Sequence, residues 1–306
     1  MERPYILHMF TPGRQMSPFD VNMAADAGYQ VIAPYCEVEL DGITALTQDA
    51  IFSRGPKGVA RTGLFIGGRN AMLAADMLER AKASMVKPFV VSVMADPSGA
   101  YTTAAAMVAC TEAALQKQGH GLDGLRVVVL GGLGPVGRIA GVIAAQAGAL
   151  VTLSSRSGAA AAEAGARETA ARFKVTMHGV SGADRAAVRA SLAEVDVVLA
   201  CAAAGVQVVS ADDLKEAKRL KVAADVNAVP PEGIAGVGVM DDGKALAGSA
   251  AVGIGALAIG NVKYQTQHRL LVQMRESDKK ALVLGFPEAF ATARAFIAER
   301  AAGGAD

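Results

Sequence analysis

Short apolar runs alternate with longer stretches of helical periodicity over residues 1–118. The apolar runs predict strands, over 5–10, 30–35, 63–66 and 88–94. The segments between and after them predict helices, over 18–28, 43–52, 71–86 and 102–117. This alternation is typical of a parallel sheet with right-handed crossovers. A polar, glycine-containing segment, 118–124, then predicts a linker.

The same alternation recurs after the linker. Five further runs predict strands separated by helices, over 126–130, 150–153, 174–177, 195–200 and 222–226. Helices are also predicted over 264–277 and 287–300. We therefore expect an α/β protein of two domains, each with a mainly parallel sheet, and a cleft between them. Residues 1–118, completed by helices within 264–306, would form a substrate domain, and residues 122–263 a Rossmann-type dinucleotide-binding domain.

A glycine-rich turn follows the apolar run 126–130 and precedes a helical pattern. Its spacing is G-x-G-x-x-G, which is a dinucleotide-binding fingerprint when a strand precedes it and a helix follows. The free N–H groups at the start of that helix would bind a pyrophosphate. The alternative is an ordinary strand–helix turn with no ligand. The residues predicted to bind the cofactor here are Gly132, Gly134, Pro135, Val136 and Gly137.

The end of the next strand bears on the choice between NAD and NADP. An NAD site usually places an acid here for the ribose 2′-hydroxyl, whereas this chain has Ser154, Ser155 and Arg156. A guanidinium and hydroxyls suit a 2′-phosphate, so NADP is favoured. The missing acid does not by itself exclude NAD, and Arg156 could instead be a solvated loop arginine.

Later strand ends supply further candidates for cofactor binding. Ala202 and Ala203 are small enough to let a nicotinamide ribose approach the backbone, although simple alanine packing explains them as well. Asn227 follows the run 222–226, where ligands bind in doubly wound sheets; its alternative is a turn in which it bonds local backbone. Gly253 opens the segment GIGALAIG, which follows no strong strand. We expect a loop there that closes over the nicotinamide.

Polar residues also follow strands of the first half. Asp20 lies at the start of a helix, and Asp96, Thr102 and Thr103 join a buried strand to a helix. These positions fall at carboxyl ends of strands, where a substrate would bind. The alternatives are a helix-dipole charge for Asp20 and capping for the threonines.

Composition narrows the class of function. The net charge of +1 gives no electrostatic basis for binding nucleic acid or an anionic membrane. The three cysteines form neither a metal motif nor a disulfide framework, which fits a reducing cytoplasm. Neither a signal peptide nor a membrane segment is expected. The four histidines show no catalytic-triad or metal spacing, so no metal is expected. Hydride transfer from an activated carbon needs no general base and fits such a site.

Five motifs together resemble the bacterial NAD(P)-dependent methylene-tetrahydromethanopterin dehydrogenases. They are SPFD (17–20), DPSGAYTTAAA (96–106), VVLGGLGPVG (128–137), DVNAVPPEGI (225–234) and GIGALAIGNVK (253–263). The resemblance covers 19–269, most of the chain. It implies a two-domain α/β subunit of one-carbon metabolism, in the formaldehyde-oxidation route of methylotrophs, with NAD(P)⁺ on the glycine turn. Because LSSR lacks the lysine of the strictly NADP-dependent type, use of both nucleotides is expected.

The resemblance also implies roles on the substrate side. The pterin, a tetrahydromethanopterin, would contact Phe19, Thr102, Thr103, His268 and Arg269. Its methylene carbon would give a hydride to the nicotinamide and leave a methenyl cation. We hypothesise that Asp20 or Asp96 offsets that charge and that Lys263 orients the pterin. We expect a homo-oligomer of a size that the sequence leaves open.

Other functions compete with this interpretation. A methylene-tetrahydrofolate dehydrogenase shares the reacting imidazolidine ring. A shikimate-type reductase needs a lysine–aspartate pair, but Lys57, Lys82 and Lys87 have no suitable setting. A cyclohydrolase activity would need a Y-x-x-x-K lysine, which is not evident in the first domain. A non-catalytic NADP-sensing protein would explain the glycine turn, but not the second domain's own polar strand-end motifs, and no basic DNA-reading helix is visible.

Overall fold

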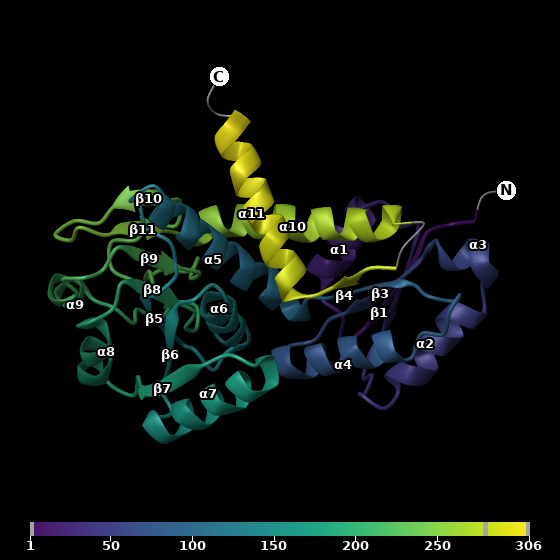
Figure 1. Ribbon diagram of the computed structural model, residues 1–306, viewed down its shortest axis with the longest axis horizontal. Helices are drawn as coiled ribbons and strands as arrows, with labels where there is room; N and C mark the ends of the chain where they lie inside the picture. Colours follow the sequence, from purple (N-terminus) through teal and green to yellow (C-terminus); the bar gives the residue numbers. More distant parts are fainter. Residues whose placement is uncertain (1–2, 278–280, 304–306) are drawn as a thin grey trace. The chain divides into compact units, whose positions relative to one another are not determined.

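The structure, a computed structural model, describes residues 3–277 and 281–303. Its contacts divide the chain into two compact units. Unit 1 comprises residues 1–102 and 264–292, and unit 2 comprises residues 103–263 and 293–306 (Figure 1). In the segments that the structure describes, no helix has the length and apolar character needed to span a membrane.

Unit 1 holds a five-stranded parallel sheet. Its order is β12 (Val283–Leu284), β4 (Ser92–Ala95), β3 (Thr62–Ile66), β1 (Ile6–Phe10) and β2 (Val31–Tyr35). Numbered along the unit, this order is 2-1-3-4-5, so the chain changes direction across the sheet between β1 and β3. Every residue of β3 is buried, as expected for a central strand covered on both faces.

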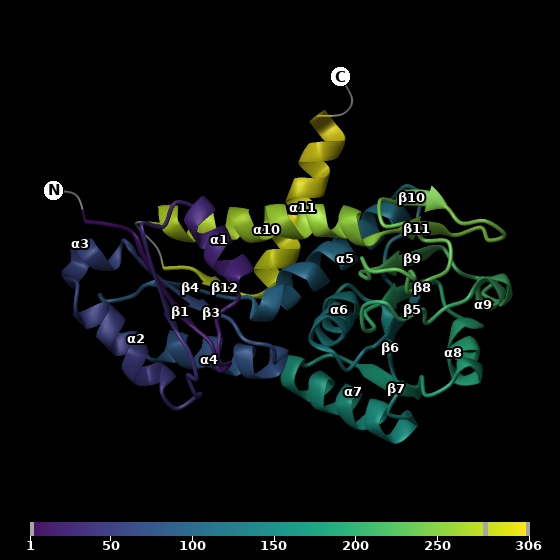
Figure 2. The same ribbon diagram turned by 180° about the vertical axis from the view of Figure 1, so that it is seen from behind.

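Helices cover both faces of the sheet in unit 1 (Figure 2). On one face lie α2 (Ile43–Phe52) and α4 (Ala71–Ala83), and on the other α1 (Pro18–Asp26) and the end of α10 (Ala256–Glu276). The short helix α3 (Gly55–Val59) precedes β3, a 3-10 turn (Pro97–Gly99) leads into α5 (Ala100–Gln116), and α11 (Phe286–Gly303) follows β12. Apolar side chains such as Leu7, Met9 and Phe65 are fully buried in the core.

Unit 2 holds a seven-stranded sheet. Its order is β10 (Asp242–Ala245), β11 (Val252–Ile254), β9 (Val222–Asp225), β8 (Val197–Ala200), β5 (Arg126–Leu130), β6 (Leu150–Ser155) and β7 (Met177–Ser181). Only β10 is antiparallel to its neighbour among these strands. The six parallel strands have the 3-2-1-4-5-6 order of a dinucleotide-binding sheet, with β5 as the first. The predicted α/β class with two mainly parallel sheets is therefore confirmed.

Helices α6 (Pro135–Gln146) and α7 (Ala159–Phe173) lie on one face of this sheet, and α8 (Arg185–Leu192) and α9 (Ala211–Glu216) on the other (Figure 1). The core between α8, α9 and the sheet contains Leu192, Val198 and Leu214. The carboxyl ends of β5 and β8 are adjacent because these strands pair directly. The chain leaves β5 toward β6 and later returns on the other side, which is the switch point where such sheets bind ligands.

The structure corrects three predicted elements. The strand predicted over 174–177 is wrong: Lys174 adopts a left-handed conformation that ends α7, and β7 runs over Met177–Ser181. The strand predicted over 88–94 begins only at Ser92. The expected loop at 253–260 is also wrong, because Gly253 lies in β11 and α10 begins at Ala256. A three-residue strand carries too little periodicity to be recognised in a sequence.

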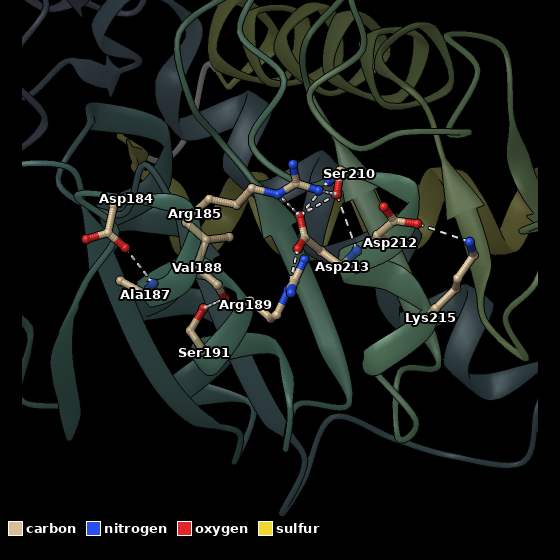
Figure 3. Close-up of polar contacts among 10 residues, drawn as sticks. All are labelled: Asp184, Arg185, Ala187, Val188, Arg189, Ser191, Ser210, Asp212, Asp213 and Lys215. Atoms are coloured by element: carbon tan, nitrogen blue, oxygen red, sulfur yellow. Dashed lines mark hydrogen bonds and ion pairs between the residues drawn. The ribbon is translucent and has the colours of Figure 1, made fainter.

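A buried carboxylate joins α8 to α9 in unit 2 (Figure 3). Asp213 is 1% exposed, and its Oδ2 accepts hydrogen bonds from the Ser210 backbone N–H (3.0 Å) and hydroxyl (2.6 Å). Its Oδ1 accepts one from Arg189 Nε at 2.9 Å, and Arg185 Nε lies 3.5 Å from Oδ2. Burial alone would raise the pKa of Asp213, but these hydrogen bonds and cations outweigh it and hold the pKa below its ordinary value.

We expect Asp213→Asn to lower the free energy of unfolding by about 2–3 kcal/mol at pH 7, because a charge-assisted set of hydrogen bonds is lost. The pKa of Asp213 is lower in the folded protein than its ordinary value of about 4. The ionised carboxylate therefore stabilises the fold above about pH 4, and this stabilisation is lost as the pH falls through the folded-state pKa. The difference between wild type and variant should therefore shrink below about pH 4. Urea unfolding at several pH values measures this difference in unfolding free energy.

Asp212→Asn is the control, because the neighbouring Asp212 is exposed and pairs with Lys215 at the surface. Equal effects of the two changes would contradict this account.

Candidate active site

The turn between β5 and α6 needs glycine at three positions where neighbouring atoms leave no room for a side chain. Gly131 has a φ of +72°, and a Cβ on it would lie 2.6 Å from the carbonyl oxygen of Cys201. A Cβ on Gly137 would lie 2.5 Å from the Gly131 oxygen, and one on Gly132 would lie 2.8 Å from Leu153 Cβ. The G-x-G-x-x-G fingerprint identified Gly132 and Gly137 but not Gly131. The sequence signal for Gly131 was its place directly before Gly132, which makes a glycine pair.

The second glycine of the fingerprint has a different environment. Gly134 is the N-cap of α6, and Pro135 and Val136 form the start of the helix. The backbone N–H of Gly134 donates to Gly131 O at 3.0 Å, which closes the turn. The nearest described atom to a Cβ on Gly134 would be that same oxygen, at 3.3 Å. The space beside Gly134 is therefore open, and the unpaired N–H groups in the first turn of α6 lie next to it. Such a helix N-terminus is suited to binding a phosphate.

The three residues at the end of β6 differ in accessibility. Ser154 and Ser155 are buried, whereas Arg156 is exposed. The Ser154 carbonyl accepts from Gly132 N at 2.9 Å, which ties the end of β6 to the glycine turn. The Ser155 hydroxyl accepts from Ser157 N at 3.2 Å and shapes the turn after the strand. Arg156 is therefore the accessible cation of this group.

Asn227 organises two neighbouring loops at the same edge of the sheet. It is buried, and its Oδ1 accepts from Gly205 N (3.1 Å) after β8 and from Val229 N (2.9 Å) after β9. Its Nδ2 donates to Pro231 O at 2.8 Å. These contacts with backbone match the alternative considered for Asn227 and place it as a residue that positions the loops.

The remaining cofactor candidates in unit 2 lie after β8 and within β11. Ala202 is half-buried and Ala203 exposed in the loop after β8, and Gly253 lies within β11. Burial and the nearby charge of Asp225 raise the pKa of the Cys201 thiol to about 12, so this cysteine is neutral at physiological pH. The Asp225 carboxylate accepts from Asn227 N (2.9 Å) and Ile234 N (3.0 Å), and burial raises its pKa.

A buried polar pair joins α1 to α10 in unit 1. Asp20 is 1% exposed and Gln267 is 0% exposed, and Gln267 Nε2 donates to Asp20 Oδ1 at 2.7 Å. Phe19, next to Asp20, is 46% exposed. Lys263 is half-buried and precedes Gln267 by one turn on α10. The sequence analysis missed Gln267, for which the only signal is an amide among the apolar residues of a helix.

Asp96 has a role in the start of α5. Its side chain is fully buried, and Oδ1 accepts from the backbone N–H groups of Tyr101 (2.9 Å) and Thr102 (3.1 Å). The Thr102 hydroxyl, also fully buried, donates to Oδ2 at 2.6 Å. This is an N-terminal cap with a carboxylate at the positive end of the helix. Thr103, the next residue, is half-buried.

The other two substrate-side candidates lie on α10. His268 is half-buried, with Nε2 3.5 Å from the backbone oxygen of Asp26, and its ring is parallel to that of Tyr264 at 6.5 Å between centroids. Arg269 is half-buried as well. Among the residues that the structure describes, no three His, Cys, Asp or Glu side chains are grouped as metal ligands.

Sequence comparisons with known proteins identify the family of the chain. Residues 18–98 match the family model of the methylene-tetrahydromethanopterin dehydrogenase N-terminal domain. The chain is 48% identical over 286 residues to the NAD(P)-dependent methylenetetrahydromethanopterin dehydrogenase of Methylorubrum extorquens, covering 93% of this chain and 96% of that one. It is 32% identical to the bifunctional protein MdtA of the same organism, covering 90% of this chain and 93% of that one.

Solved structures support the fold. Quinate dehydrogenase from Corynebacterium glutamicum, in complex with NAD, has a TM-score of 0.50 at 13% identity and covers 97% of this chain and 99% of its own. The 48% identity over 93% of the chain confirms the family resemblance inferred from the motifs. The chain belongs to the family of NAD(P)-dependent methylenetetrahydromethanopterin dehydrogenases.

Proposed function

We propose that this protein oxidises methylenetetrahydromethanopterin to the methenyl form by transferring a hydride to NAD(P)⁺. The observation that carries the proposal is the 48% identity to an enzyme of that name over 93% of the chain. The switch-point geometry of unit 2 supports it, because the glycine turn and the ends of β6, β8 and β9 converge where such sheets bind dinucleotides.

The residues of unit 2 suit the nucleotide. Gly132, Gly134 and Gly137, with Pro135 and Val136, would hold the pyrophosphate at the start of α6. Arg156 would bind the adenosine end, with Ser155 shaping its turn and Ser154 tying the end of β6 to the glycine turn. Ala202 and Ala203 would border the nicotinamide, which supplies the hydride acceptor, and Asn227 would position the loops around it. Gly253 lies buried in β11 against Leu246 and Val237 and does not belong to this group. The residues require no metal for this chemistry.

The substrate-side candidates on or beside α1, α5 and α10 suit a substrate that becomes a cation. Loss of hydride leaves positive charge on the methenyl carbon, and a preorganised carboxylate stabilises such charge as it develops. We assign this role to Asp20, held by Gln267, and we assign orientation of the pterin to Lys263. Asp96 would act through its cap, by positioning Thr102, and Thr103 follows in the same turn of α5. Phe19, His268 and Arg269 would contact the pterin.

An anaerobic absorbance assay of the purified protein tests the proposal. We expect reduced nicotinamide and methenyl-pterin absorbance to rise together when methylenetetrahydromethanopterin is supplied with NAD⁺ or with NADP⁺. Activity with NADP⁺ alone would mean that Arg156 and its serines suffice for selectivity. Turnover on methylene-tetrahydrofolate but not on the methanopterin substrate would contradict the proposal and support the folate alternative. Tight nucleotide binding without turnover on any pterin would favour a non-catalytic sensor.

A further inference from the structure

A glycine lies inside α10 where the packing of the described chain does not require one. Gly260 is in the second turn of this helix, where a glycine costs about 1 kcal/mol relative to alanine. Apart from the neighbouring backbone of the helix itself, no heavy atom of the described residues would lie within 4 Å of a Cβ on Gly260. Gly141 in α6 and Gly165 in α7 differ, because a Cβ there would lie 2.8 Å from Leu153 Cδ2 and 2.5 Å from Leu133 Cδ2. Gly260 therefore leaves space open on the surface of α10 and does not make room for another part of the described chain.

Three further residues lie on the same face of the helix. Lys263, Tyr264 and Gln267 follow Gly260 at the i+3, i+4 and i+7 spacing that aligns side chains along a helix. Together the four residues form the α10 face. Lys263 is half-buried, Tyr264 is 39% exposed and Gln267 is fully buried. Long side chains on a helix lean toward the preceding turn, so those of Lys263 and Tyr264 flank the space above Gly260.

Contacts with α1 support one end of the α10 face. The Tyr264 ring is parallel to that of His268, with 2° between their planes. His268 Nε2 lies 3.5 Å from the backbone oxygen of Asp26, at the end of α1. Near the start of α1, Asp20 Oδ1 accepts from Gln267 Nε2 at 2.7 Å. The α10 face thus leads directly to the carboxylate assigned to the reacting carbon.

The α10 face has the shape and the chemistry that a pterin ring requires. A pterin is a fused nitrogen heterocycle with a ring carbonyl and an amino group, and its pyrimidinone half stays planar in the tetrahydro form. A glycine lets such a ring approach the helix backbone closely. An aromatic side chain such as Tyr264 can stack on the ring or contact its edge, and the Lys263 ammonium can donate to the ring carbonyl. The rise from Gly260 to Gln267 is about 10 Å, so the planar half and the reacting carbon can lie on successive turns.

We propose that the α10 face is the bed for the planar half of the pterin, with Gly260 beneath the ring and Tyr264 against it. The reacting carbon then lies toward Asp20. The inference rests on the proposed function, because it assigns the face to that substrate. It adds Gly260 and Tyr264 to the substrate contacts, and it explains why α10 keeps a glycine that lowers its stability and that the described packing does not require.

Gly260→Ala separates binding from stability. The added methyl group meets no described neighbour and alanine favours a helix, so we expect a melting temperature at or above that of wild type. The same methyl group would lift the pterin off the backbone. The KM for methylenetetrahydromethanopterin should therefore rise about tenfold, and further in Gly260→Leu, whereas the KM for NADP⁺ should stay at its wild-type value. Thermal unfolding and steady-state kinetics measure the two effects.

Two substitutions of Tyr264 test the contribution of its ring. Tyr264→Leu should raise the KM for the pterin about tenfold because the aromatic contact is lost. Tyr264→Phe keeps the ring and should stay close to wild type. Gln273→Ala is the matched control, because Gln273 is exposed on the same helix more than three turns further along. It should change neither the melting temperature nor either KM.

A wild-type KM for the pterin in a folded Gly260→Leu protein would overturn this inference while the proposed function stands. An equal rise in the KM for NADP⁺, or a change in oligomeric size by light scattering, would overturn it as well, because the face would then contact the nucleotide or a second copy. A wild-type protein that turns over no pterin would instead contradict the proposed function. In that case, calorimetric titration with pterin itself decides: binding to wild type that Gly260→Leu lacks supports the bed, and equal or absent binding in both contradicts it.

Discussion

We expect Gly134→Ala to fold normally and to raise the KM for NAD(P)⁺ about a hundredfold. The φ of −70° and ψ of 163° at Gly134 are accessible to alanine, and the nearest described atom to the added Cβ would be Gly131 O at 3.3 Å. No other described heavy atom lies within 4 Å, so the methyl group would occupy open space beside the start of α6, which a bound pyrophosphate needs. Steady-state kinetics with NAD⁺ and NADP⁺, together with thermal unfolding, measure the two effects separately.

Gly121→Ala is the control for this change. Gly121 lies in the segment before β5, its φ is not in the left-handed region, and no heavy atom within the described parts of the chain lies within 4 Å of an added Cβ. This variant should keep both stability and nucleotide affinity. A Gly134→Ala protein with wild-type KM for both nucleotides would show that the glycine turn does not contact the cofactor, and would remove the basis for placing the pyrophosphate there.

Predictions from the sequence succeeded where the determining interactions are local. The strand, glycine turn and helix over 126–146 could be recognised because the apolar run, Pro135 and the helical periodicity are adjacent in sequence. Gly131 could not be recognised in the same way, since the atom that excludes a side chain there belongs to Cys201, which directly follows β8 and lies 70 residues away in sequence. For a similar reason β7 was displaced in the prediction: Gly179 is required by the approach of Glu163 on α7, and a glycine weakens the strand pattern.

The candidate site shows the same limit. Asp20 was identified from its place at a strand end, but its partner Gln267 lies 247 residues away, and no local pattern links them. Asp96 was identified as a polar strand-end residue, yet its contacts are those of a cap, a distinction that depends on side-chain geometry.

We expect Asp20→Asn to lower kcat about a hundredfold and to leave the fold and the KM values close to those of wild type. Asparagine has nearly the shape of aspartate, and its Oδ1 can still accept the hydrogen bond from Gln267 Nε2 that Asp20 accepts at 2.7 Å. The substitution therefore removes the negative charge and keeps the contact between α1 and α10. If that charge stabilises the developing methenyl cation, its loss raises the barrier of hydride transfer by an amount typical of one preorganised electrostatic group.

The measurement is kcat with saturating pterin and nucleotide, accompanied by thermal unfolding. Asp26→Asn is the matched control, because Asp26 ends the same helix, is exposed and contacts His268 through its backbone oxygen. A purely structural role for Asp20 predicts a lower melting temperature with little change in kcat, which is the opposite of the split expected here. The asparagine variant carries no charge at position 20. A kcat within twofold of wild type in a stable Asp20→Asn protein would therefore show that the Asp20 charge does not stabilise the methenyl cation and that another group must do so.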